Sequence, residues 1–432
     1  MDEFRKGSWK ENKEDKENKE YKDSLYSLYS LYSWYSSYQQ HFTHQPMFTL
    51  KSVSPLGRRG TIETNHGPIE TPFFFPVATA GAMRGITHTD LADLQAQVLL
   101  CNTYHLHLHP GEDVIADAGG LHAFIGWNRP ILTDSGGYQV FSLRGLRRIS
   151  DRGVEFRAHT DGSLHFLGPV EAMEIQWKLG SDIIMCFDEC PPSTASRREI
   201  EMAVDRTLQW AKVCKKTHEC LRKERIEKRE RNETKTENND EGKSFCSSPP
   251  FHSLSSSPLL FGIVQGGLHF DLRKKCIEEL QAIGFDGYAL GGLAVGETEE
   301  EMLGILRELT PLLPAEQPRY LMGVGVMHQL RQCVQLGIDM FDCVLPMRIA
   351  RHGTILLSDG SALRITNAKF KEDHTPIDSD SPSDLSRTHL KSYLHHLFKV
   401  NERLAETIAC KQNLGVTLKM MWELRAKIER HS

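Results

Sequence analysis

Three aspartates stand where short apolar runs end, and their side chains could act together. They are Asp134 in LTDSGGYQVFSL, Asp188 in CFDECPP and Asp342 in DMFDCVLPMR. A single aspartate in such a place is usually a helix N-cap or a loop hydrogen-bonder. Cleavage at an anomeric carbon, however, requires paired carboxylates, one as nucleophile and one as acid and base. The three residues therefore predict glycosyl-transfer chemistry if the fold brings them to one place.

Glycine-rich segments accompany these aspartates and indicate a flat ligand. GIVQGG, YALGGLAVGE and DSGGY let the backbone approach a planar ring closely, because glycine has no side chain. A guanine edge offers N–H donors beside a carbonyl acceptor, which a carboxylate next to an amide can read. Asp188 and Gln265 form such a pair. Tyr138 and Met322 could enclose the ring, although aromatic and methionine side chains near strand ends are more often part of the core.

The segment NTYHLHLHPG offers a rival interpretation, a metal-dependent barrel hydrolase. His105, His107 and His109 alternate in the manner of metal ligands. Such a site needs further histidines after later strands, and FGIVQGG and YALGGLAVGE provide none. We therefore expect the three histidines to be mainly structural.

The apolar pattern predicts a scaffold that would gather these residues. Short apolar runs alternate with longer helical patterns, which is typical of repeated βα units. Eight runs indicate an α/β fold, a TIM (β/α)8 barrel, whose active site is built from the loops that follow the strands. No G-x-G-x-x-G follows the first run, which argues against an open doubly wound sheet. The runs are FFFPVA, QVLLCN, PILTD, DIIMCFDE, LLFGIVQ, GYALGG, RYLMGV and MFDCVL.

Two further elements flank the predicted barrel. MFTLKSVS, which starts at Met47, predicts the first strand of an N-terminal antiparallel β element. After Arg351 a loop-rich stretch leads into a strongly helical tail from about Thr388. We expect a C-terminal helical subdomain over about 366–432.

Two low-complexity segments complete the organisation of the chain. Residues 1–46 pass from a charged run into SLYSLYSLYSWYSSYQQ, whose three-residue repeat suits neither an amphipathic helix nor a strand. We expect this tail to be disordered. Residues from about 221 to 257 are first charged and then rich in serine and proline, which predicts an irregular surface insertion within the 47–432 domain.

Composition excludes several classes of protein. The 432 residues are 39% hydrophobic, enough for one large barrel, and the formal charge of −5 argues against a binder of polyanions over its whole surface. No apolar run approaches the roughly 18 residues of a membrane span, and the N-terminus lacks the order of a signal peptide. Ten cysteines at irregular spacing indicate reduced thiols. We expect a cytoplasmic protein.

Taken together and in order, the motifs resemble a known family, the bacterial-type tRNA-guanine transglycosylases. The resemblance rests on NTYHLHLHPG, GGLH, ILTDSGGYQVFSL, FDECPP, GIVQGG, GFDGYALGGLAVGE, YLMGVG and DMFDCVLP. It runs from about Met47 to the C-terminus, interrupted by the 221–257 insertion. It implies a homodimeric enzyme of queuosine biosynthesis that acts on the anticodon loop of a tRNA, whose bases can be splayed into a pocket.

The resemblance also implies a role for each candidate residue. Asp342 would attack C1′ of the wobble guanosine and hold the tRNA covalently, and Asp134 would serve as acid and base. Asp188, Gln265 and the amide of Gly292 would read the base edge, with Cys190 beside Asp188. Other positions would meet the 7-substituent (the Leu293–Ala294 peptide, oriented by Glu297), stack on the ring (Tyr138, Met322) and hold the flanking bases (Arg348, Arg351).

The reaction implied is exchange of the wobble guanine of GUN anticodons, in the tRNAs for Asp, Asn, His and Tyr. LAVG with Val295, together with Cys190, is similar to the bacterial pattern that accepts 7-aminomethyl-7-deazaguanine. Direct insertion of queuine is the alternative. A non-catalytic RNA-binding partner subunit is a third hypothesis, which the retained Asp134, Asp188 and Asp342 argue against.

One departure from the family concerns its zinc site, a C-x-C-x2-C motif with a distant histidine. The corresponding positions here are Ser381, Ser383, Ser386 and Gln412. Serine hydroxyls and a glutamine amide are poor zinc ligands, so we expect no structural zinc and no other cofactor.

Overall fold

The computed structural model describes residues 47–142, 147–192, 194–237 and 257–432. The predicted disordered tail, residues 1–46, lies outside these ranges, as does most of the Ser/Pro-rich half of the predicted insertion.

The described chain opens with a three-stranded antiparallel sheet in the order β1-β2-β3. Its strands are β1 (Phe48–Ser54), β2 (Gly57–Ile62) and β3 (Ile69–Thr71). The predicted first strand after Met47 and the N-terminal antiparallel element are thus confirmed.

Eight parallel strands follow and close into a barrel, as the sequence predicts. Their spatial order is β4-β14-β13-β12-β11-β10-β6-β5, so each strand lies beside its neighbour in the chain. The ring closes where Val77, just after β4, pairs with Leu100 of β5. Each strand coincides with one of the eight predicted runs. They are β4 (Phe73–Phe75), β5 (Leu99–Cys101), β6 (Ile131–Thr133), β10 (Ile183–Met185), β11 (Leu259–Val264), β12 (Gly287–Leu290), β13 (Arg319–Leu321) and β14 (Met340–Asp342).

Strand side chains alternate between two buried clusters. In β11, Leu259, Phe261 and Ile263 fill the barrel interior, whereas Leu260 and Val264 pack under the surrounding helices. Because both faces of such a strand are buried, its sequence is a continuous apolar run instead of an alternating one.

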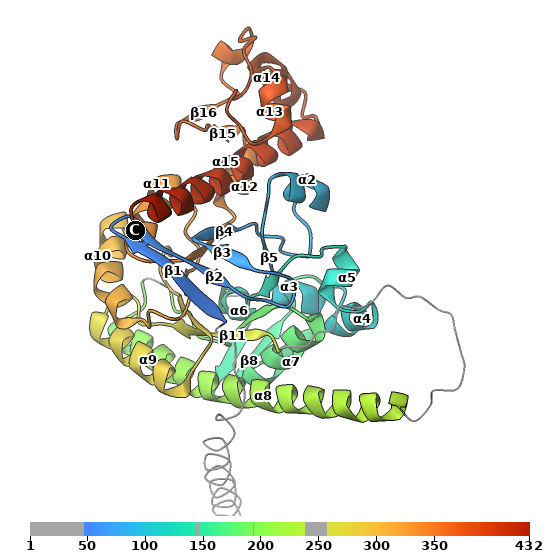
Figure 1. Cartoon of the computed structure of the whole chain (residues 1–432), viewed down its shortest axis with the longest axis vertical. Coiled ribbons are helices and arrows are strands. Elements are labelled where there is room, and N and C mark those ends of the chain that lie inside the picture. Colours follow the sequence, from blue (N-terminus) through green and yellow to red (C-terminus); the bar gives the residue numbers. More distant parts are fainter. Residues whose placement is uncertain (1–46, 143–146, 193, 238–256) are drawn as a thin grey trace, which may run out of the picture. The chain divides into compact units, whose positions relative to one another are not determined.

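Helices surround the barrel and return the chain from the end of one strand to the start of the next (Figure 1). Local signals begin some of them: Thr298 and Glu301 form a capping box at the start of α10, whose first turn is acidic. The helices are α2 (His88–Asp93), α3 (Thr103–Leu108), α4 (Glu112–Asp117), α5 (Leu121–Ile125), α6 (Gly137–Ser142), α7 (Pro169–Leu179), α8 (Arg197–Glu237), α9 (Phe270–Ile283), α10 (Glu299–Leu309), the 3-10 helix η1 (Thr310–Leu312), α11 (Met327–Gln335) and α12 (Leu345–Arg351).

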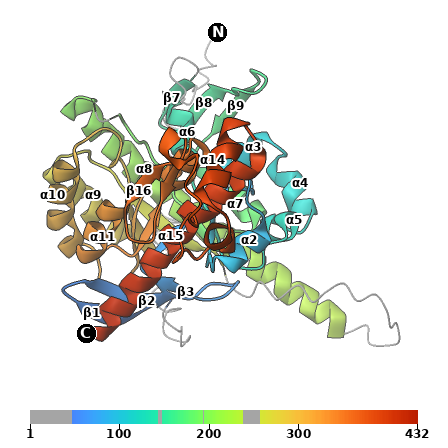
Figure 2. The same ribbon diagram turned by 90° about the horizontal axis from the view of Figure 1, so that it is seen from above.

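A second small sheet interrupts the barrel between α6 and α7. It is antiparallel, in the order β7-β8-β9, with β7 (Arg147–Ser150), β8 (Gly153–Arg157) and β9 (Leu164–Leu167). Since it follows the C-terminal end of β6, it lies on the side of the barrel away from β1–β3 (Figure 2). The sequence pattern does not predict this sheet.

The first half of the predicted insertion is helical, so the prediction of an irregular segment is wrong there. Helix α8 continues through residues 221–237, because charged residues that form helices well also pair one turn apart along it. Lys223 and Arg231 both pair with Glu227. Composition alone hides this spacing, because the segment is low in apolar residues.

The C-terminal subdomain is helical, as expected, with a hairpin in the loop-rich stretch before it. The hairpin and the short 3-10 helix precede three helices, and the last of these packs against β1, β2 and β4 (Figure 1). The elements are β15 (Thr354–Leu356), β16 (Ala362–Arg364), η2 (Ala368–Phe370), α13 (Asp384–Thr388), α14 (Lys391–Lys399) and α15 (Arg403–Arg430).

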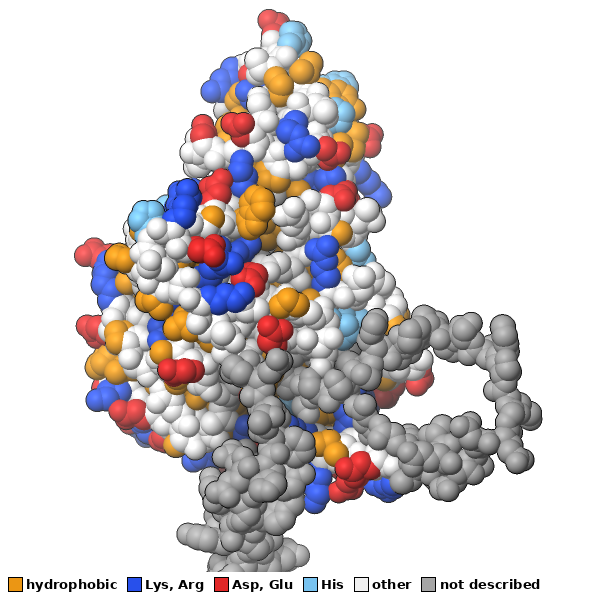
Figure 3. Space-filling view, viewed as in Figure 1, with side chains coloured by type: hydrophobic (Ala, Val, Ile, Leu, Met, Phe, Trp, Pro, Cys, Tyr) orange, Lys and Arg blue, Asp and Glu red, His pale blue; other side chains and the backbone are white. Residues whose placement is uncertain are grey.

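The surface seen in Figure 3 carries interspersed positive and negative side chains, with apolar ones in small groups. Of the helices that the structure describes, none combines the length and apolar character needed to span a membrane.

Candidate active site

The three predicted aspartates lie at the C-terminal rim of the barrel. Asp134 follows β6, Asp188 follows β10, and Asp342 is the last residue of β14. Because parallel strands of a closed barrel end on the same rim, the fold brings these carboxylates to a common mouth.

Asp134 is fixed by donors from its own loop and from the loop after β5. The amides of Thr103 and Gly136 donate to Oδ1 at 3.0 and 3.1 Å, and the side-chain amide of Asn102 donates to Oδ2. Burial raises the pKa of Asp134 to about 7, and the negative charge of Asp342 acts in the same direction. The three hydrogen bonds lower the pKa and only partly offset this rise. A carboxyl group with this pKa can both give and take a proton near neutral pH.

Asp342 is held through one of its two oxygens. The Tyr320 hydroxyl and the Gly323 amide both donate to Oδ1, at 2.6 and 3.0 Å. Burial raises the pKa of Asp342 above its usual range, although these donors lower it. Both printed donors therefore bind the same oxygen of Asp342.

The charges of the two carboxylates act on the same part of the barrel. The charge of Asp342 adds to the burial that raises the pKa of Asp134. Burial also raises the pKa of Tyr320, a residue of the barrel interior, and the charges of Asp342 and Asp134 act in the same direction. A negative charge nearby disfavours the ionised form of a carboxyl or hydroxyl group.

Asp188 and Gln265 form the predicted amide–carboxylate pair. Nε2 of Gln265 donates to Oδ2 of Asp188 at 2.7 Å, and the Ser135 hydroxyl lies 3.4 Å from Oδ1. Burial raises the pKa of Asp188 to about 6, and the two donors oppose this shift. Oε1 of Gln265 is buried, and no N–H or O–H of the described chain reaches it. An acceptor left in this state is suited to a donor on a ligand.

Gly292 and Cys190 lie against this pair. A Cβ on Gly292 would be 2.5 Å from Oε1 of Gln265 and 3.7 Å from Sγ of Cys190, and the Gly292 φ of +62° also favours glycine. Burial raises the pKa of the Cys190 thiol to about 12, and Asp188 adds to the shift. The Cys190 side chain is thus a neutral thiol at the edge of the site.

The loop after β12 is held by a carboxylate. Glu297 accepts from the amides of Ala294 and Val295, the latter at 3.1 Å. Ala294 has a φ of +60°, an uncommon conformation for a residue with a side chain, and the Leu293 side chain is buried. The N–H of Ala294 and the carbonyl of Leu293 belong to one trans peptide and point in opposite directions. Since the N–H faces Glu297, the carbonyl points away from Glu297.

The remaining predicted contacts differ in exposure. Tyr138 on α6 has 58% of its surface exposed. Met322 packs partly against the barrel interior. Arg348 and Arg351 lie in the last turn of α12, the helix that follows Asp342.

The comparisons with known proteins agree with this geometry. The family model described as queuine tRNA-ribosyltransferase matches residues 54–432. A queuine tRNA-ribosyltransferase of Halothermothrix orenii is 43% identical over 379 residues, which cover 88% of this chain and 92% of the relative.

The chain belongs to the queuine tRNA-ribosyltransferase family. A relative of the same name from Solidesulfovibrio magneticus is 44% identical over 88% of this chain and 93% of its own length. Another, from Prochlorococcus marinus, is 44% identical over 83% of this chain and 86% of its own length. The family consists of tRNA-guanine transglycosylases, which are glycosyltransferases that modify tRNA in the queuosine pathway.

The alternating histidines of this transglycosylase do not share a site. His105 packs by its ring edge against His159, whereas His107 bonds Glu112 at 2.8 Å and His165 at 3.2 Å. Their different partners agree with the structural role expected for them.

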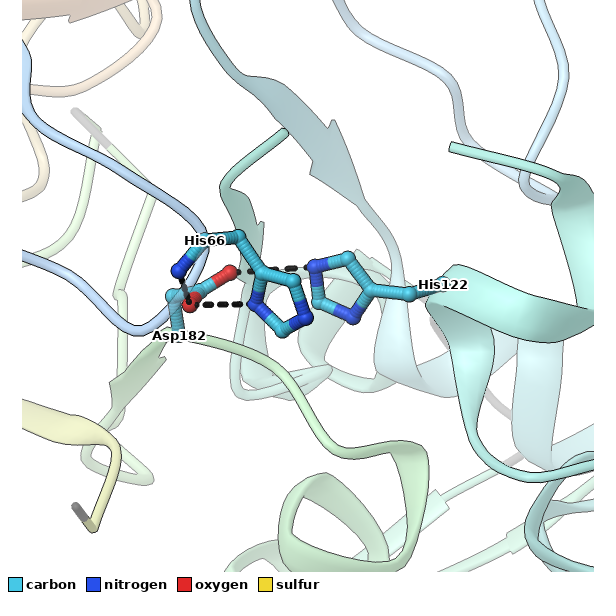
Figure 4. A group of neighbouring side chains, drawn as sticks. All are labelled: His66, His122 and Asp182. Atoms are coloured by element: carbon cyan, nitrogen blue, oxygen red, sulfur yellow. Dashed lines mark hydrogen bonds and ion pairs between the residues drawn. The ribbon is translucent and has the colours of Figure 1, made fainter. Parts of the chain in front are cut away.

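Another histidine pair contacts Asp182, the residue before β10 (Figure 4). His66, His122 and Asp182 form the one group of metal-ligand type found within the described ranges. Each oxygen of Asp182 contacts one imidazole nitrogen, at 2.8 and 3.1 Å, and accepts one backbone amide, from His66 or Ile131. The two rings are stacked 3.6 Å apart at 12°, so their lone pairs run parallel and do not converge. The carboxylate therefore ties the β2–β3 turn and α5 to the start of β10.

Several residues that build the site have no role predicted from the sequence. Asn102 is predicted only as the polar end of a strand, and Ser135 lies within the motif DSGGY. Tyr320 stands two positions before Met322 on the inward face of β13. Arg273 is fully buried on α9, and its guanidinium donates to the carbonyls of Gly291 and Gly292 at 2.9 and 3.3 Å. Alternation along β13 could have indicated Tyr320, but nothing in a helical segment marks an arginine as buried.

Proposed function

We propose that this enzyme replaces the wobble guanine of GUN-anticodon tRNAs, those for Asp, Asn, His and Tyr, with 7-aminomethyl-7-deazaguanine. The observation that supports the proposal best is the electrostatic pairing of Asp134 with Asp342 at a mouth that also holds the Asp188–Gln265 pair. The first pair suits chemistry at C1′, and the second suits the edge of a guanine.

In the first displacement Oδ2 of Asp342 attacks C1′ of the wobble nucleotide. The bond from C1′ to N9 breaks, its electron pair leaves with guanine, and Asp134 in its acid form gives the base a proton. The tRNA is then an ester of Asp342. Asp134 is suited to this step because burial and its neighbour raise its pKa to about 7.

In the second displacement Asp134 acts as the base. Its carboxylate takes the N9 proton of the incoming deazaguanine, whose N9 attacks C1′ and expels Oδ2 of Asp342. Asp134 thus regains the proton that it gave to guanine in the first displacement. Because C1′ is inverted twice, the configuration of the sugar is retained.

We propose that Asp188 and Gln265 bind the edge of both bases, so Asp188→Asn should weaken both. We expect the variant to fold, because the Gln265 amide can turn over and accept from the new asparagine. The site then presents a donor to the base N–H groups, so kcat/KM for exchange of labelled guanine should fall by about 10²- to 10⁴-fold. An unchanged kcat/KM in a variant with unchanged Tm would remove Asp188 from base recognition.

The Leu293 loop supports the choice of the aminomethyl base. With the Ala294 amide bound to Glu297, the neighbouring carbonyl is the group left to accept from a protonated amine. Val295 and Cys190 would leave less room for the cyclopentenediol of queuine. The deciding test is competition of the two bases in labelled-guanine exchange, where we expect the aminomethyl base to inhibit at the lower concentration.

Glu297→Gln should change base choice more than guanine exchange. The neutral side chain can turn its amide toward the loop and release the Ala294 peptide to present N–H instead of carbonyl. We expect KM for the aminomethyl base to rise about tenfold, the effect of one hydrogen bond to a charged group, while KM for guanine changes little. Glu300→Gln, at an exposed site on α10, is the matched control. Equal rises for both bases would contradict this role.

We also propose that the enzyme acts as a cytoplasmic homodimer on the tRNA anticodon loop, with Tyr138 and Met322 stacking on the base. Arg348 and Arg351 would contact the nucleotides that flank the wobble position, which suits their place on the helix after Asp342.

A further inference from the structure

Helix α15 and the loop before α13 come together where the family resemblance implies a zinc site. Oγ of Ser381 donates to Oε1 of Gln412 at 2.6 Å, and the Ser383 amide donates to Oγ of Ser381 at 2.9 Å. Ser386 follows in the first turn of α13. All four side chains are at least 97% buried. Ser381 and Gln412 therefore meet in the buried region that also holds Ser383 and Ser386.

The residues present do not fit zinc. They offer neutral oxygen atoms and an amide, whereas structural zinc sites use cysteine thiolates and histidine nitrogens. Two of these atoms, Oγ of Ser381 and Oε1 of Gln412, already bond each other. The polar groups of this site instead form hydrogen bonds with one another.

We propose that a metal-free clasp centred on Gln412 replaces the zinc, and that it positions α12 for tRNA binding. We define the clasp as Asp378, Ser381 and Gln412. The first part concerns only stability and metal content, and the second rests on the proposed function.

The clasp fixes the loop through both ends of the Gln412 amide. Oε1 accepts from Ser381, and Nε2 donates to Oδ2 of Asp378 at 2.8 Å. The same Asp378 oxygen accepts from the amide and the hydroxyl of Ser358, both at 2.8 Å. The buried side-chain amide of Gln412 thus joins α15 to the loop before α13 and, through Asp378, to the turn after β15.

Charged groups hold the rest of the loop. Arg387 donates to the carbonyls of Ser381 and Pro382 at 2.6 and 2.9 Å. Lys411, next to Gln412 on α15, pairs with Asp384 at 3.3 Å and with Asp90 of α2 at 2.8 Å. These bonds supply cross-links that a metal would otherwise provide.

A short path leads from the clasp to the helix that follows Asp342. Nε2 of Gln412 also donates to the Leu356 carbonyl at 2.8 Å, and the Leu356 amide donates to Asn413 at 2.8 Å. Asn413 in turn donates to the carbonyl of Pro346, in the first turn of α12, at 3.0 Å. Arg348 and Arg351 lie on that helix. Loss of Gln412 should therefore displace the proposed tRNA contacts without touching the two catalytic carboxylates.

Two other hydroxyls supply internal controls. Oγ of Ser383 and Oγ of Ser386 are buried without a hydrogen-bond partner in the described parts of the chain. Removing an unpaired buried hydroxyl costs no bond, whereas removing Gln412 takes one donor from Asp378 and leaves the Ser381 hydroxyl without its acceptor. Ser386→Ala should thus be neutral or stabilising, and Gln412→Met, similar in size, should be destabilising.

The experiment compares four proteins with and without dialysis against a chelator. They are the wild type, Ser386→Ala, Gln412→Met and the quadruple variant Ser381→Cys, Ser383→Cys, Ser386→Cys, Gln412→His. The measurements are zinc content, Tm, and kcat and KM for tRNA in guanine exchange.

We expect wild type and Ser386→Ala to hold no zinc and to keep their Tm after dialysis. Gln412→Met should have a lower Tm and a KM for tRNA raised about tenfold, the effect of about one lost contact, with kcat little changed. The quadruple variant should take up one zinc, and its Tm should fall on dialysis.

Different outcomes separate the two parts of the proposal. One tightly held zinc per wild-type chain, or a Gln412→Met Tm equal to that of wild type, would overturn the clasp. A lowered Tm with unchanged KM would overturn the link to tRNA alone. The measurements of zinc content and Tm do not depend on enzymatic activity. They therefore test the clasp even if the proposed reaction is wrong.

Discussion

Asp342→Asn should fold normally and lose base exchange by at least about 10⁴-fold, as expected when the nucleophile of a covalent mechanism is removed. Asparagine keeps a carbonyl oxygen for the Tyr320 hydroxyl and the Gly323 amide, the two donors that hold Oδ1. Its amide cannot form the ester with C1′. The loss should appear in kcat, because the side chain reads no part of the base.

Guanine exchange on tRNA and Tm would be measured side by side for this variant. Asp271→Asn is the control, since Asp271 lies on the outside of α9 in an exposed ion pair with Arg197. We expect Asp271→Asn to exchange at the wild-type rate. Exchange by Asp342→Asn within tenfold of that rate, with an unchanged Tm, would contradict the assignment.

Asp134→Asn should lower the exchange rate by about 10³-fold, in the range expected for loss of a general acid and base. An asparagine can neither protonate departing guanine nor take the N9 proton of the incoming base. The Asp342 ester should therefore form slowly and also break down slowly.

The same variant should remove part of the pH dependence of stability. The folded pKa of Asp134 is about 7, above the ordinary aspartate value, so the folded state binds more protons than the unfolded state between about pH 4 and 7. The contribution of this group to stability is therefore present at acid pH and is lost as pH rises through about 7. Asp134→Asn lacks this loss.

Thermal unfolding of both proteins across this range is the measurement. The Tm of wild type relative to Asp134→Asn should fall as pH rises from about 4 to 7 and then level off. A constant difference would show that Asp134 titrates near its ordinary value.

The barrel could be predicted because its strands are buried on both faces. Runs such as LLFGIV and DIIMCF are continuous apolar segments, and helical patterns lie between successive runs. The polar residue that ends each run then has a defined place, the C-terminal rim. This is why Asp134, Asp188 and Asp342 could be grouped before their contacts were known.

Features that depend on partners distant in sequence could not be predicted. The sheet β7–β9 has exposed alternate residues and short strands, so its pattern resembles a loop. Arg273 and Tyr320 gain their roles only through the glycine carbonyls and the carboxylate that tertiary packing brings to them. The 221–237 extension of α8 could not be predicted from composition, because its stabilising charge pairs follow from the spacing of the residues.

The most direct test of the mechanism is to map the covalent bond itself. Enzyme, tRNA and an inhibitory base analogue would be combined, denatured, digested with nuclease and protease, and measured by mass spectrometry. The ribose adduct should lie on the peptide that carries Asp342 and be absent from Asp342→Asn. An adduct on Asp134 or Asp188, or one that persists in the variant, would contradict the mechanism.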